Sequence, residues 1–272
     1  MFWVLQSEAY ARALLIGYIV MELAGLEIGI LIFVALLAGA INTVAGGGSN
    51  LVLPTLMIMG MPPEVANATN RVGIFVESVV AISEFKRHKK LETFDLKAIL
   101  IPMAVGGLFG SLAAAFAPPD ILKPLLIGTM ICMSLLVLFR PAVVSPPSGT
   151  EVRRVSDTPS AWIGLLAAGF YGGFVQAGVG FLLLASIAGT LRYDIVRANA
   201  IKLVCTFVFT FVSLGIFIWQ DQVAWVEGFV LSIGYVAGAY FGVKLAVYTD
   251  PKVLRWFLFA ATLLAGGAAM FS

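Results

Sequence analysis

Residues 42–50 read Asn-Thr-Val-Ala-Gly-Gly-Gly-Ser-Asn, and this glycine-rich tract lies between apolar segments near 26–45 and 48–60. The second segment has roughly a dozen residues, whereas a helix needs about 20 to cross the hydrocarbon core of a bilayer. Consecutive glycines allow a tight turn that exposes N–H groups, and such backbone is tolerated at membrane depth only inside protein or beside an aqueous cavity. The tract therefore predicts a hairpin with a short second arm, whose intramembrane turn presents the amino end of a helix, a site that attracts anions.

A similar tract occurs in the second half of the chain. Residues 171–180, Tyr-Gly-Gly-Phe-Val-Gln-Ala-Gly-Val-Gly, join apolar segments near 161–178 and 180–190. Arg71 and Lys202 are two cations in apolar segments near 66–85 and 195–218. The number of residues between them equals the number between Gly47 and Gly178, so the same motifs recur at the same spacing. Later segments near 96–117 and 120–139 correspond to those near 225–247 and 252–271. An internal repeat of this size is typical of secondary transporters.

Composition indicates which solvent the chain folds in. Hydrophobic residues make up 60% of the sequence and charged residues 12%, and the mean hydropathy is +1.00. A water-soluble protein of this size needs more polar residues than this to cover its hydrophobic core, so we predict an all-α integral membrane protein. Each of its two repeats is a hairpin with a short second arm plus three transmembrane helices. The predicted parts are a lead-in helix at 1–25, a first repeat at 26–140, a cytoplasmic linker at 141–160 and a second repeat at 161–272.

The loop charges orient the two repeats. The loop Lys86 to Lys90 is strongly basic and is predicted to be cytoplasmic, whereas its counterpart, Trp219 to Gln222, has no cation. The loop at 62–64 also lacks cations, while its counterpart carries Arg192 and Arg197. Although Lys123 does not fit, the pattern predicts that the repeats have opposite orientations in the membrane.

Several functions are disfavoured by what the sequence contains. The net charge of +2 gives no reason to expect a nucleic acid partner. His88, the single histidine, lies in the basic loop, and Cys132 and Cys205 lie apart in apolar segments, so neither a metal site nor hydrolytic chemistry is expected. No nucleotide-binding motif or cofactor site is recognised. A non-transporting receptor or partner subunit and, with less support, a membrane-embedded enzyme are the alternatives to a transporter.

Arg71 and Lys202 are the cations expected to carry the function. Each lies about 10 Å below the start of its helix, where insertion of a cation costs about 2.5–3.5 kcal/mol. They could extend to the interface, or they could form an anion site near the midplane. Glu77 could shuttle a proton or form a fixed salt bridge with Arg71 or another cation. The predicted substrate-binding residues are Asn42, Thr43, Gly46, Gly47, Gly48, Ser49, Asn70, Arg71, Gln176, Gly178, Gly180, Asn199 and Lys202.

The order of these motifs resembles a known family. Residues 39–49, then Pro54 and residues 60–66, are similar to the first-half signature of the sulfite exporter TauE/SafE family. Residues 169–173, through Gly178 to 199–202, are similar to its second-half pattern. The resemblance implies a multi-pass protein of the plasma (inner) membrane that moves sulfite, sulfonates such as sulfoacetate, or related anions. Alternating access is the expected mechanism, driven by the anion's own gradient alone or with protons coupled through Glu77; the sequence predicts no oligomeric state.

Overall fold

The computed structural model of the protein describes residues 25–44, 46–139 and 150–248, and every regular element within these ranges is a helix. The all-α prediction is therefore confirmed. The helices are Gly25–Val44, α2 (Ser49–Ile58), α3 (Pro63–Arg87), α4 (Leu96–Ala115), α5 (Pro119–Phe139), α6 (Pro159–Phe174), α7 (Val179–Leu184) with the π-helical turn η2 (Ala185–Thr190), α8 (Ile195–Trp219) and α9 (Trp225–Tyr248).

Four of these helices are long and apolar enough to cross a membrane: Gly25–Val44, α4, α8 and α9. The two predicted short arms are also present, as α2 with ten residues and as α7 and η2 with six residues each. The first arm of the second hairpin is shorter than its apolar segment, because α6 ends at Phe174 and Gln176 turns the backbone with a φ of 66°. The predicted segment at 252–271 and nearly all of the lead-in helix at 1–25 lie outside the described residues.

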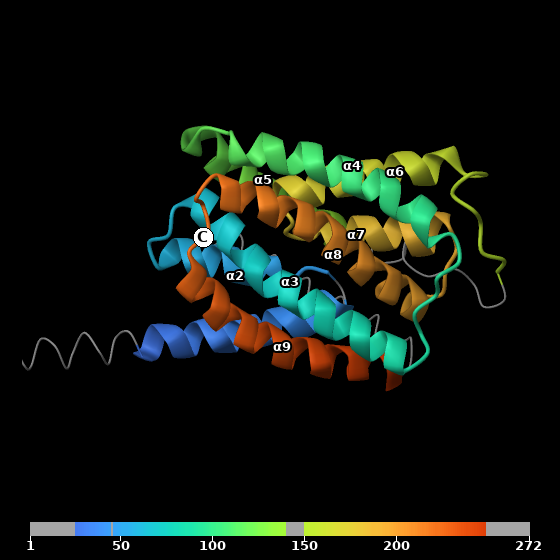
Figure 1. Ribbon diagram of the computed structural model, residues 1–272, viewed down its shortest axis with the longest axis horizontal. Helices are drawn as coiled ribbons and strands as arrows, with labels where there is room; N and C mark the ends of the chain where they lie inside the picture. Colours follow the sequence, from blue (N-terminus) through green and yellow to red (C-terminus); the bar gives the residue numbers. More distant parts are fainter. Residues whose placement is uncertain (1–24, 45, 140–149, 249–272) are drawn as a thin grey trace, which may run out of the picture.

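The helices form three layers (Figure 1). α3 and α8 make the central layer; α4 and α6 lie on one side of it, and α9 and the helix Gly25–Val44 lie on the other. Glycines allow the outer pairs to approach closely. A Cβ on Gly173 of α6 would lie under 3.0 Å from the carbonyl oxygen of Gly107 of α4. A Cβ on Gly238 of α9 would also lie under 3.0 Å from the carbonyl oxygen of Leu36. Close packing on small residues is how helices associate within membranes.

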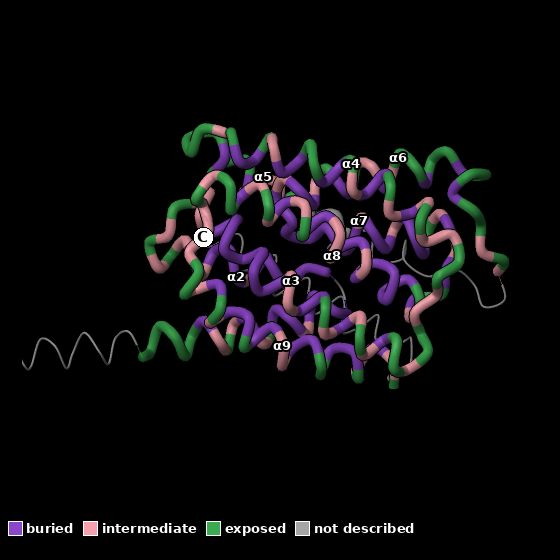
Figure 2. Tube along the Cα trace, in the orientation of Figure 1, coloured by how far each residue is buried: buried purple, intermediate pink, exposed green. Residues whose placement is uncertain are grey.

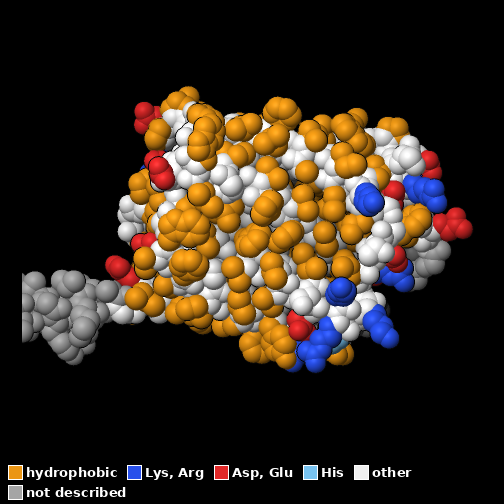
Figure 3. Space-filling model, in the orientation of Figure 1, with side chains coloured by type: hydrophobic (Ala, Val, Ile, Leu, Met, Phe, Trp, Pro, Cys, Tyr) orange, Lys and Arg blue, Asp and Glu red, His pale blue; other side chains and the backbone are white. Residues whose placement is uncertain are grey.

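Burial follows the same layers (Figure 2): the buried residues lie between the helices, and exposed ones line the outer surfaces and both ends of the bundle. On the face that Figure 3 shows, the surface between the ends is mainly hydrophobic, and charged side chains gather at the two ends. On the face in view, Lys and Arg side chains lie at one end. A hydrophobic belt with charges beyond it matches a bilayer and its two aqueous surfaces.

Candidate functional site

The two interrupted hairpins meet at their glycine-rich turns. The N–H of Gly180 donates a hydrogen bond of 3.2 Å to the carbonyl oxygen of Gly46. Gly46 has a φ of 91°, in the left-handed region that favours glycine, and a Cβ there would lie under 3.0 Å from the Cα of Gly180. Gly178, which precedes α7, also has a positive φ, of 76°. The structure thus brings together the two tracts that the sequence had singled out, and only glycine fits where they cross.

Arg71 extends from α3 to the end of α6. Its Nη1 and Nη2 donate hydrogen bonds to the carbonyl oxygens of Gly172 (3.0 Å) and Gly173 (2.6 Å). The guanidinium also lies 4.9 Å from the centre of the Phe217 ring, a distance typical of a cation–π interaction. The side chain is fully buried, so it does not extend to the interface. The interpretation in which Arg71 extends to the membrane interface is therefore excluded.

Lys202 makes the corresponding contacts at the other hairpin. Its Nζ donates to the carbonyl oxygens of Asn42 (2.8 Å) and Thr43 (2.9 Å), at the end of the helix Gly25–Val44, and to Oδ1 of Asn199 (2.9 Å). Each cation thus sits at the carboxyl end of a hairpin's first helix, whose partial negative charge it complements. The sequence had pointed to the amino ends of the short arms, which adjoin the same turns, as the part of each hairpin that attracts an anion.

Glu77 is also fully buried. Both of its carboxylate oxygens accept hydrogen bonds from Nδ2 of Asn42, at 3.0 and 2.9 Å, and Oε1 also accepts from the hydroxyl of Thr43 at 3.3 Å. Among the described residues it forms no salt bridge within 4.0 Å, either with Arg71 or with another cation. Asn42 and Thr43 therefore join Glu77 to Lys202, since their side chains contact the carboxylate and their carbonyls contact the ammonium.

Other predicted polar residues form a second group around the start of α2. Nδ2 of Asn70 donates to the hydroxyl of Ser49 (3.1 Å), and the hydroxyl of Tyr235 donates to Oδ1 of Asn70 (2.7 Å). On the second hairpin, Nε2 of Gln176 donates to the hydroxyl of Thr210 (3.0 Å). Gly47 and Gly48 complete the first turn beside these groups.

Sequence reasoning missed two tyrosines that hold these groups. Tyr235 of α9 bonds Asn70, and Tyr171 of α6 donates to the carbonyl oxygen of Ala177 (2.6 Å), within the second turn. Both lie in apolar segments, where they resembled ordinary hydrophobic residues. The available signal was the phenol hydroxyl itself, which needs a partner when it is buried.

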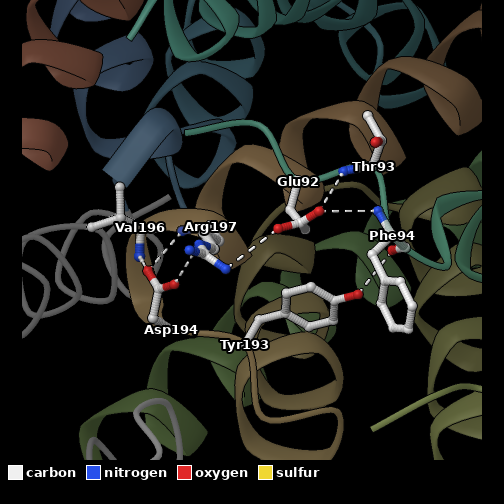
Figure 4. A network of polar contacts seen from close by, with 7 residues as sticks. All are labelled: Glu92, Thr93, Phe94, Tyr193, Asp194, Val196 and Arg197. Carbon is white, nitrogen blue, oxygen red and sulfur yellow. Dashed lines mark hydrogen bonds and ion pairs between the residues drawn. The ribbon is translucent and has the colours of Figure 1, made fainter. Parts of the chain in front are cut away.

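A separate polar network closes the end of the bundle where α3 and α4 are joined (Figure 4). Arg197 pairs with Glu92 (3.3 Å) and Asp194 (3.1 Å), and Asp194 also caps the first turn of α8. The hydroxyl of Tyr193 donates to the carbonyl oxygen of Phe94 (2.9 Å). Burial, helped by the nearby Asp95 and Glu92 carboxylates, raises the pKa of Tyr193 to about 12. The network joins the loop after α3 to the start of α8.

The apolar helices and buried polar turns define a multi-pass membrane protein. A model of the sulfite exporter TauE/SafE family matches residues 31–270, and the chain belongs to this family, as its motifs predicted. It is 32% identical to the probable membrane transporter protein YfcA of Escherichia coli K12, over 85% of this chain and 84% of that protein. It is 29% identical to a probable membrane transporter protein of Haemophilus influenzae, over 84% and 88% of the two chains. The protein is thus a membrane transporter of this family.

Proposed function

We propose that this transporter carries small anions, most of all sulfur-containing oxyanions or organosulfonates such as sulfite or sulfoacetate, out of the cell across the plasma membrane. The observation that carries the proposal is the pair of fully buried cations, Arg71 and Lys202, beside two glycine-rich turns that touch. A buried cation in a membrane is costly and marks a functional site by default. The family to which the chain belongs is described as one of sulfite exporters, which supports the choice of anion.

In the proposed site, Arg71 and Lys202 supply positive charge, and the two glycine-rich turns supply backbone N–H donors. The N–H groups of Gly46, Gln176, Val179 and Gly180 already donate to carbonyl oxygens within the fold, so the proposed donors are those of residues 47–49 and 177–178. Asn42, Thr43, Asn70 and Asn199 surround these turns. Oxygen-rich anions need several donors in a fixed arrangement, because they lose a strong hydration shell on entering. The backbone N–H groups of a turn are held rigidly and meet that need.

The proposed mechanism is alternating access between two inverted repeats. The reciprocal packing supports it: α4 of the first repeat lies against α6 of the second, and α9 of the second lies against Gly25–Val44 of the first. A two-fold axis in the membrane plane would generate such an exchange of partners. Rocking of one repeat against the other would expose the turns to each side in turn. Glu77 is the proposed carrier of a coupling proton, because it is the buried carboxylate nearest to these groups.

Transport into proteoliposomes tests this function. The purified chain is reconstituted, and uptake of radiolabelled sulfite, sulfoacetate, sulfate and acetate is compared with uptake by empty vesicles. We expect saturable uptake of a sulfur-containing anion, its loss in Arg71→Met, and wild-type uptake in Lys97→Met, which removes an exposed cation. Absence of uptake for every anion, by protein that binds none of them in a thermal-shift assay, would refute the proposal.

A further inference from the structure

The two buried cations are not equivalent, and the difference begins with their hydrogen bonds. A lysine ammonium has three N–H donors and no acceptor. Lys202 already has three acceptors, the carbonyl oxygens of Asn42 and Thr43 and the amide oxygen of Asn199, all within 2.9 Å. Its donors are therefore fully used by the protein. An anion could reach Lys202 only by displacing one of these contacts.

Arg71 has a donor to spare. Its terminal nitrogens bond the carbonyls of Gly172 and Gly173, but its Nε is buried without a hydrogen-bond partner among the described residues. A buried donor that lacks an acceptor is unusual in a folded protein and calls for an explanation. Because Nε and the adjacent N–H of Nη2 can hold two oxygens of one oxyanion, a guanidinium with a free Nε is suited to an anionic ligand.

The charges around the two cations also differ. Arg71, Lys202 and Glu77 are the charged side chains that are buried in the part of the chain that the structure describes. Glu77 and Lys202 contact the same two residues, Asn42 and Thr43. Arg71, in contrast, has no carboxylate within 4.0 Å among the described residues. In the state in which Glu77 has released its proton, the three buried charges sum to one positive charge, and it belongs to Arg71.

The helix ends do not alter this sum. Each hairpin places one carboxyl end, with a partial negative charge, beside one amino end with a partial positive charge. These partial charges oppose each other within each turn. The hydroxyl of Tyr235 donates a hydrogen bond to Oδ1 of Asn70 and adds no charge to the site. The excess positive charge is left for the ligand.

We propose, resting on the anion-transport function above, that the site takes one anion with a single negative charge, which Arg71 contacts through Nε, while Glu77 neutralises Lys202. The anion site thus lies on the Arg71 side of the two crossing turns rather than midway between the cations. Among sulfur compounds, the favoured class is the monoanion, such as hydrogensulfite or a simple sulfonate. A dianion would enter with an uncompensated charge.

The test compares methanesulfonate with sulfate, two tetrahedral anions of similar size whose charges differ by one. Binding to the purified wild type is measured by isothermal titration calorimetry in detergent. We expect methanesulfonate to bind about tenfold or more tightly than sulfate, because an unmatched charge costs more at a buried site than in water. If sulfate binds as tightly or more tightly, the inference is wrong and the anion-transport proposal stands. If neither these anions nor sulfite binds, the transport proposal itself fails.

Three substitutions, made singly and in two combinations, then locate the charge. Glu77→Gln adds one positive charge to the site, so the preference should shift towards sulfate. Lys202→Met should weaken methanesulfonate binding by leaving Glu77 unpaired, and adding Glu77→Gln should restore it. Arg71→Lys keeps the charge but removes Nε, and Glu77→Gln should not restore its binding. Rescue of Arg71→Lys but not of Lys202→Met by that second substitution would place the anion at Lys202 and overturn the inference. The wild-type anion comparison decides the matter if a variant does not fold.

Discussion

Replacement of Gly46 by alanine should destabilise the protein at the crossing of its two hairpins. The substitution has two costs. An L-residue at a φ of 91° loses about 1–2 kcal/mol relative to glycine. The new Cβ would also lie under 3.0 Å from the Cα of Gly180, and such overpacking against backbone costs about 1–3 kcal/mol. Together they predict a loss of about 2–5 kcal/mol in the free energy of unfolding.

Gly60 provides a matched control for this prediction. Its φ is 90°, nearly that of Gly46, but a Cβ there would have no atom within 4 Å. Gly60→Ala therefore carries the backbone cost alone, about 1–2 kcal/mol. The difference between the two variants, about 1–3 kcal/mol, isolates the contact between the hairpins.

The assay is equilibrium unfolding by a denaturing detergent in mixed micelles, followed by circular dichroism, together with anion binding to the folded fraction. Gly46→Ala should be the less stable variant and should bind anions more weakly, because the displaced turns no longer present their N–H groups together. Gly60→Ala should bind as the wild type does. Equal stability of the two variants would show that the turns do not touch in the protein, and the reasoning about the site would fail with it.

Three further predictions concern the rest of the bundle. Tyr193→Phe should lower the free energy of unfolding by about 0.5–1.5 kcal/mol at neutral pH, because it removes one hydrogen bond. The pKa of Tyr193 is raised to about 12 in the folded protein, so the wild type should lose stability as pH rises from about 10 to about 12. The variant should lose less stability over that range. Gly110→Ala should lower the melting temperature, because the new Cβ would overlap the backbone of α6. Gly128→Ala is the control and should leave the melting temperature unchanged, since a Cβ there has no atom within 4 Å. Equal shifts in melting temperature would contradict the close α4–α6 packing. In a background without native cysteines, Asp221→Cys should react with an impermeant maleimide on intact cells, whereas Lys89→Cys should react only after lysis; the reverse result would invert the predicted orientation.

Much of the fold could be predicted because hydrophobicity and glycine act locally. The length of each apolar segment fixes whether it can cross a bilayer, so the short arms α2 and α7–η2 were expected from their sequence alone. The glycine tracts likewise marked the turns, since Gly46 and Gly178 have the positive φ values that such turns need. The end of α6 at Phe174 was not expected, because an apolar sequence continues through the turn that follows it.

The candidate site was predicted as a set of residues but not as a set of contacts. Arg71 and Lys202 were recognised because a cation in an apolar helix is costly wherever it points. Their partners were not, since each cation bonds carbonyls about a hundred or more residues away in the chain. Every residue has a backbone carbonyl, so no residue type marks the carbonyls that accept hydrogen bonds from the two cations. The role of Asn42 and Thr43 between Glu77 and Lys202 was hidden for the same reason.

The sequence by itself therefore determined the lipid environment, the helical class, the family, the places where the backbone turns within each hairpin and the identity of the buried charges. These follow from local composition, because each segment must satisfy its own backbone and hydrophobic surface in lipid. Only the tertiary structure decided which turn meets which, through Gly46 and Gly180, and which cation keeps a free donor. These follow from long-range packing, where the distance between two groups depends on every helix that lies between them.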